Sequence, residues 1–114
     1  MSISRRGLLA AAVASVVAMQ GASAQAQGSS YVLATATTGG TYYPVGVALA
    51  TLTKVRLEPS TGIGMSAISS AGSGENVRLL REDEAQFALM AGLYGYYAVN
   101  GVGPLEEEGP QENV

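Results

Sequence analysis

Thr35-Ala-Thr-Thr-Gly-Gly-Thr-Tyr-Tyr-Pro-Val-Gly46 is the stretch that decides the fold of this chain. An apolar run leads into it, and apolar residues at helical spacing lead out of it. Gly39 and Gly40 permit a positive φ or a close backbone approach, and Pro44 suits the first turn of a helix. We therefore expect a strand, a glycine turn and a helix, whose free N–H groups favour an anion. The spacing matches neither a Walker A loop nor a Rossmann fingerprint, so a turn without a ligand stays an equal alternative.

The same order of strand, turn and helix repeats twice more along the chain. We expect strands at about 31–37, 64–69 and 87–90, and helices at about 42–54, 75–84 and 93–99. The second strand alternates only weakly, which is typical of a strand covered on both faces of a parallel sheet. The predicted fold class is therefore α/β, with a parallel sheet built from β-turn-α repeats. Residues 105–114, with three consecutive glutamates, are expected to form a solvated, disordered tail.

Residues 1–26 have the organisation of an export signal. Arg5 and Arg6 precede an apolar run of twelve residues, and two overlapping Ala-x-Ala sites follow. This pattern predicts cleavage after Ala26, with Ala24 as the alternative, and a periplasmic location. The segment Ser4–Leu9 is similar to a twin-arginine export signal, although the general secretory route stays open. An uncleaved membrane anchor is less favoured, because the apolar run is short.

Composition excludes several function classes. The chain has 114 residues without Cys or His, which excludes disulfides, thiol chemistry, a Ser-His-Asp triad and imidazole metal sites. Without residues 1–26, four basic and nine acidic residues remain, a net charge of −5 that does not suit nucleic acid. We expect no cofactor. Adjacent helical positions do not converge on one ion, so Glu82, Asp83 and Glu84 are interpreted as a solvated face rather than a metal site.

Three blocks of sequence resemble one known family. They are Thr38–Gly46 (TGGTYYPVG), Ser73–Leu80 (SGENVRLL), and a third block formed by Glu84–Ala88 (EAQFA) with Tyr96–Gly101 (YYAVNG). In this order they resemble the TAXI family of TRAP-transporter solute receptors. The resemblance implies a periplasmic, two-lobed, type II-like binding protein. Such a receptor captures a small organic solute, often a carboxylate, and delivers it to a membrane permease.

This chain departs from the family in two respects. It is much shorter, so residues 27–104 are expected to form part of the first lobe, and the second lobe is missing. Members of the family also usually carry polar residues after the third strand, where this chain has Ala91, Gly92 and Leu93. The resemblance therefore places the ligand at the first two turns rather than the third.

The candidate ligand-binding residues lie in those two turns. They are Gly39, Gly40, Thr41, Tyr42, Ser70, Ser73 and Gly74. Amides and hydroxyls at two helix N-termini can hold a carboxylate without an arginine. The alternative is that Thr41 and Ser73 only cap their helices; given the family resemblance, we expect each to do both. Tyr94 and Tyr97 should share a helix face, either as a wall of the solute site or, as we favour, in packing.

Two other function classes remain open at this point. If this partial lobe holds no solute, the chain is either a truncated remnant without binding activity or an exported interaction module. A small hydrolase would need Ser70, Ser73 and Glu75 as nucleophile and base. That arrangement lacks the usual His, Cys or Lys partner and is therefore disfavoured.

Overall fold

The structure, a computed structural model, describes residues 28–114, so the predicted export signal at residues 1–26 lies outside the described residues. Every predicted strand and helix is present. The elements are β1 (Ser30–Ala34), α2 (Tyr42–Arg56), α3 (Glu58–Thr61), β2 (Gly64–Ile68), α4 (Ser73–Arg81), β3 (Phe87–Ala88), α5 (Gly92–Asn100) and a 3-10 helix, η1 (Gly103–Glu108).

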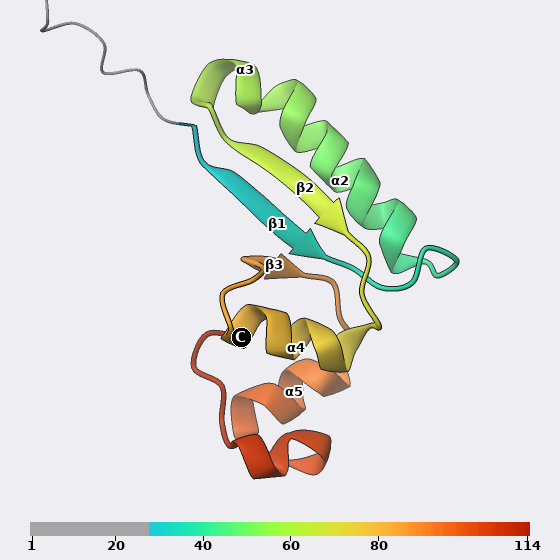
Figure 1. The fold of residues 1–114 in the computed structure, drawn as a ribbon, viewed down its shortest axis with the longest axis vertical. Helices are drawn as coiled ribbons and strands as arrows, with labels where there is room; N and C mark the ends of the chain where they lie inside the picture. Colours follow the sequence, from blue (N-terminus) through green and yellow to red (C-terminus); the bar gives the residue numbers. More distant parts are fainter. Residues whose placement is uncertain (1–27) are drawn as a thin grey trace, which may run out of the picture.

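The three strands form one parallel sheet in the order β2-β1-β3. Ser30 pairs with Gly64 across β1 and β2, and Leu33 pairs with Phe87 across β1 and β3. The connections that follow the three strands therefore leave from the same end of the sheet (Figure 1). The predicted α/β class with a parallel sheet is confirmed.

Helix α2 packs closely on one face of the sheet through its small residues. A Cβ added to Gly46 would lie 2.3 Å from Cγ2 of Thr35 and 3.5 Å from Cδ2 of Leu33, both of which belong to β1 or its end. Gly46 and Ala50 are the buried residues of this helix. The apolar residues whose spacing predicts the helix are instead exposed; they are Val45, Leu49, Leu52 and Val55. The large apolar residues that predict the helix therefore lie on a different side of it from the small residues that pack on the sheet.

The opposite face of the sheet is covered by α4. Ala34 is fully buried against Leu79 and Ala85, and Val32 packs on the same cluster. A second cluster joins Val77 of α4 to residues of α5 and η1. The layers therefore run from α2 through the sheet and α4 to α5 and η1 (Figure 1). None of the helices formed by residues 28–114 is both long enough and apolar enough to span a membrane.

The C-terminal segment differs from the predicted disordered tail. Regular structure does not end at Gly103 and Pro104, because these residues begin η1. Leu105 is buried against Val77 and Ala98, which pins η1 to the helical layer. Gln111 is also buried, and its N–H donates to the oxygen of Ala98 at 2.8 Å. The three consecutive glutamates suggested a solvated tail. The prediction did not take into account Leu105, the leucine just before them, which packs against the helical layer.

Candidate functional site

One buried side chain, Asn76 of α4, joins the carboxyl ends of all three strands. Its Nδ2 donates hydrogen bonds to the main-chain oxygens of Thr35 after β1 and Leu89 after β3, both at 2.7 Å. Its Oδ1 accepts a hydrogen bond from the hydroxyl of Ser70, which follows β2, at 2.6 Å. Asn76 is fully buried, so water does not compete for these bonds. A single amide therefore fixes the relative positions of the three connections at this end of the sheet.

The same bonds explain why two strands are shorter than the sequence predicts. Strand β1 ends at Ala34 rather than near residue 37, and β3 ends at Ala88 rather than near residue 90. The oxygens of Thr35 and Leu89 are taken by Asn76, so the sheet ladder does not continue through them. Carbonyl oxygens only accept hydrogen bonds, which also fixes which end of the Asn76 amide faces them.

The second turn begins its helix one or two residues earlier than predicted. The residue before the first turn of α4 is Gly72 rather than Ser73, and its φ of 107° with ψ of −157° requires glycine. Glu75 therefore occupies the third helical position, and its carboxylate accepts a hydrogen bond from the N–H of Ala71 at 2.5 Å. This contact closely resembles the Glu half of a capping box. The prediction that Ser73 caps this helix is wrong.

Ser73 and Gly74 can contact a ligand without losing an internal hydrogen bond, whereas the Ser70 hydroxyl is already used within the protein. The Ser73 hydroxyl oxygen accepts the N–H of Ala91 at 2.9 Å, which leaves its own proton free to be donated. The Ser70 hydroxyl lies in hydrogen-bond reach of Asn76 Oδ1 and the Thr35 oxygen, and accepts the N–H of Gly72. Ser70 is therefore a structural residue of this face, and its predicted contact with a ligand would have to break an internal bond.

An aromatic side chain from α5 lies beside this turn. A Cβ on Gly74 would lie 3.5 Å from Cε1 of Tyr94. The rings of Tyr94 and Tyr97 meet edge to face with their centroids 5.8 Å apart, which confirms that they share a helix face. Gly74 is exposed and Tyr94 half-buried, so the ring borders the open amides at the start of α4. The first amides of any helix lack an intrahelical acceptor, which makes this the natural place for an acceptor group.

The first turn is arranged differently from the expectation. Neither Gly39 nor Gly40 has a positive φ. Gly40 donates its N–H to the oxygen of Thr37 at 2.9 Å, and a Cβ there would lie 3.3 Å from that oxygen, so the close approach is the relevant glycine property. Thr41 precedes α2 but makes no side-chain cap bond, so the capping interpretation of this residue is wrong. Within residues 28–114, no hydrogen bond joins Gly39–Tyr42 to Ser70–Gly74.

Both basic residues of α4 pair with acidic neighbours, and Arg81 does so with Glu82 and Glu108. Arg78 pairs with Glu82, which lies four residues along the chain, and also with Glu75 at 3.5 Å and Glu84 at 3.6 Å. The hydrogen bond and the charge of Glu82 raise the pKa of Arg78 above its ordinary value. Desolvation acts to raise the pKa of Glu82, but the hydrogen bonds and charges of Arg78 and Arg81 together outweigh it and the pKa is lowered. The candidate ligand face therefore relies on amides and hydroxyls rather than on a free cation.

The geometry does not assemble a hydrolytic site from the predicted serines. The Glu75 carboxylate binds Ala71 and Arg78, and no hydrogen bond among the described residues joins it to Ser70 or Ser73. In the part of the chain that the structure describes, no cluster of three or more acidic side chains is placed to hold a metal ion.

The sequence analysis missed the role of Asn76. A signal was present, because Asn76 lies three and four residues before Leu79 and Leu80 and therefore on the apolar stripe of this helix. A polar residue on such a stripe needs a buried partner.

Two surface hollows lie along α2, and neither includes a residue of the strand-end loops. Gly39, Thr41 and Gly74 are exposed, so the candidate site is an open face.

The sequence was also compared with known protein families. Residues 33–114 match the model of the NMT1-like family, a periplasmic binding-protein-like family. The match begins within β1 and includes α4, Asn76 and both candidate turns. An open parallel sheet with helices on both faces is consistent with part of such a binding protein. Because the match covers well over half of the sequence, the chain belongs to the NMT1-like family.

Proposed function

We propose that this protein is the solute-binding component of a TRAP-type transporter of the TAXI kind. It captures a small organic solute, a carboxylate or an amino acid, and passes it to membrane permease subunits. Membership of a periplasmic binding-protein-like family supports the solute-binding part of this proposal. That family is typically extracellular or periplasmic and generally non-enzymatic. The TAXI assignment rests on the three sequence blocks quoted above.

The observation that carries the proposal is the set of hydrogen-bond donors at the α4 N-terminus that have no intrahelical acceptor. The first amides of α4 lack intrahelical acceptors, the Ser73 hydroxyl keeps a proton to donate, and Tyr94 lies beside Gly74. Asn76 fixes this turn against the ends of all three strands, so the donors are held in place before a ligand arrives. Fixed donors at a helix N-terminus favour a carboxylate.

Affinity is expected to be low for this chain alone. An open face leaves one side of the ligand in water, where charge interactions are worth only about 1 kcal/mol. We expect dissociation constants in the millimolar range, roughly −4 kcal/mol of binding free energy.

The test is calorimetric titration of the protein with small dicarboxylates and amino acids. Ser73→Ala should weaken binding at least about fivefold, because a hydrogen bond to a charged ligand is lost. Ser60→Ala on α3 is the control, since Ser60 is exposed and bonds only to Leu57 of its own turn among the described residues. The proposal fails if no compound of either class binds, or if both variants bind like the unmodified protein.

A non-binding interaction module is the second candidate. The observation in its favour is the number of large apolar side chains left exposed on α2 and α5, including Leu52, Val55, Leu93 and Val99. Large exposed apolar patches often mark surfaces that bind other proteins. Titration without any solute response, from a folded protein, would favour this candidate.

A further inference from the structure

The outer edge of β2 is open among the described residues. β2 pairs with β1 on one side and is the end strand of the sheet. The N–H of Gly64 donates to the Ser29 oxygen, and the Ile68 oxygen accepts the N–H of Thr35. Since main-chain groups alternate in direction along a strand, those of Met65 and Ala67 face outward. The edge sequence Gly-Met-Ser-Ala-Ile carries no charge and no proline, the usual devices that prevent edge pairing.

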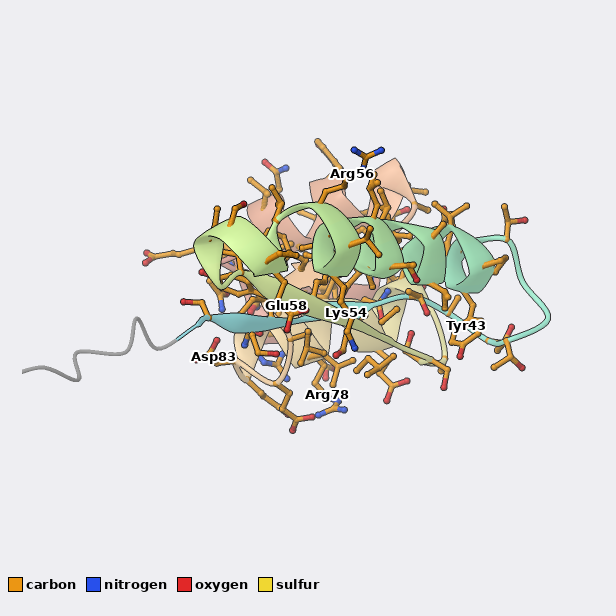
Figure 2. All side chains as sticks on the ribbon, turned by 90° about the horizontal axis from the view of Figure 1, so that it is seen from above. Tyr43, Lys54, Arg56, Glu58, Arg78 and Asp83 are labelled. Atoms are coloured by element: carbon orange, nitrogen blue, oxygen red, sulfur yellow. The ribbon has the colours of Figure 1, made fainter. Side chains whose placement is uncertain are left out.

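The flank of α2 continues this edge as one surface. A groove of about 250 Å³ lies between Val47, Thr51 and Lys54 of α2 and Met65–Ala67 of β2. A second, wider hollow, lined by Ala48, Thr51, Leu52 and Val55, shares Thr51 with the groove. Figure 2 shows Lys54 extending from α2 on the β2 side, whereas Arg56 points to the opposite side. The surface is therefore centred near Thr51 and belongs to one flank of the helix.

We propose that a second copy of this chain occupies this surface. The two β2 strands pair antiparallel through Met65 and Ala67, which gives a continuous sheet of six strands. A two-fold axis perpendicular to the sheet then places both α2 helices on the same face, side by side and antiparallel. An uncharged strand edge is complementary to its own copy, because each outward N–H meets an outward oxygen.

The charges on α2 also suit this arrangement. An axis midway between residues 50 and 51 places Lys54 opposite the partner's Val47, not opposite the partner's Lys54. The methylene stem of a lysine can cover an apolar side chain while its ammonium stays in water. Val47 and Val55 are 39% and 63% exposed, so the surface offers apolar area to both copies.

The size of the surface sets the expected strength. A helix of 15 residues is about 22 Å long. A strip of that length, about one helix and one strand edge wide, gives an interface smaller than the roughly 1,200–2,000 Å² of stable specific complexes. We therefore expect a weak dimer whose population depends on protein concentration.

The test is sedimentation velocity over about 5–200 µM protein, on the chain as it is recovered from expressing cells. Thr51→Lys should raise the dimer dissociation constant at least about tenfold, because two ammonium groups then meet near the axis, and added salt should partly reverse this. Leu49→Lys is the matched control. Leu49 lies seven residues before Arg56, two helical turns away, and therefore on the flank that faces away from β2.

Ala67→Pro tests the strand edge separately from the helix. It removes an outward N–H while the groups that pair with β1 remain, so the dimer should be lost and circular dichroism should still show a folded protein. A monomer at all concentrations would overturn the proposal. So would a dimer that Leu49→Lys weakens as much as Thr51→Lys does, since association would then use the other flank. A dimer that survives Thr51→Lys would equally exclude this surface. The outcome is independent of whether any solute binds.

Discussion

Asn76→Asp is the substitution that tests most directly how the strand ends are held. The two side chains have nearly the same shape, so packing is conserved and only the hydrogen-bond donors are lost. The fully buried amide nitrogen gives two bonds of 2.7 Å to the oxygens of Thr35 and Leu89. A carboxylate donates to neither oxygen, and it adds a buried charge beside them.

The magnitude follows from those two bonds. A buried acceptor left without its donor costs about 1–3 kcal/mol, so the variant should lose about 2–6 kcal/mol of unfolding free energy at neutral pH. Since small domains are stable by only about 5–15 kcal/mol, Asn76→Asp should lie close to unfolding. Urea denaturation followed by tyrosine fluorescence and far-ultraviolet circular dichroism measures this difference.

The pH dependence of the variant separates the charge from the lost donors. Burial raises the pKa of the introduced carboxyl above its unfolded value of about 3.9. The folded state then binds the proton more tightly, so the variant should recover part of its deficit as the pH falls from neutral through that raised pKa. The neutral carboxyl regains one donor. Asn76→Leu is the control, because it removes both donors without a titratable group and should show no such recovery.

Two results would refute this reasoning. An Asn76→Asp variant within about 0.5 kcal/mol of the unmodified protein at neutral pH would mean that the amide is not needed to hold the strand ends. A deficit that stays constant with pH in Asn76→Asp, or that recovers equally in Asn76→Leu, would mean that the buried charge plays no part.

Two further predictions concern packing and charge. Gly46→Ala should destabilise the protein by about 1–3 kcal/mol in chemical denaturation, because the new methyl group meets Cγ2 of Thr35 at 2.3 Å, and Thr35→Ser should relieve the clash. Gly95→Ala, with only a distant sulfur atom near its Cβ, is the helix control and should be neutral or stabilising; equal losses at both glycines would contradict the close-approach argument. The lowered pKa of Glu82 means that its pairing with Arg78 stabilises the fold above the unfolded pKa and is lost as the pH falls through the folded value. Arg78→Gln should therefore lower the melting temperature slightly near neutral pH, by an amount that shrinks as the pH falls below the ordinary glutamate pKa, and a difference that does not change with pH would exclude the ion pair as its cause.

The sequence by itself determined the order and type of the three strands and the three longer helices, but not the short helices α3 and η1. Glycine turns after short apolar runs, helical spacing and a proline in the first turn are local properties, so the three strand-turn-helix units could be read from neighbouring residues. The helix at Tyr42–Arg56 shows the limit of that information. Its large apolar residues predicted a helix correctly, but the sheet packs against Gly46 and Ala50, because Thr35 and Leu33 leave room only for small side chains.

Only the tertiary structure decided how the strand ends meet. Asn76 contacts Thr35, which lies 41 residues away in the sequence, and no local pattern encodes a partner at that distance. The same holds for Ser70, whose hydroxyl was predicted for a ligand but is used by Asn76, and for Leu105, whose burial depends on α4 and α5. Secondary structure follows from short-range backbone preferences, whereas the partners of a buried polar group follow from which elements the sheet brings together.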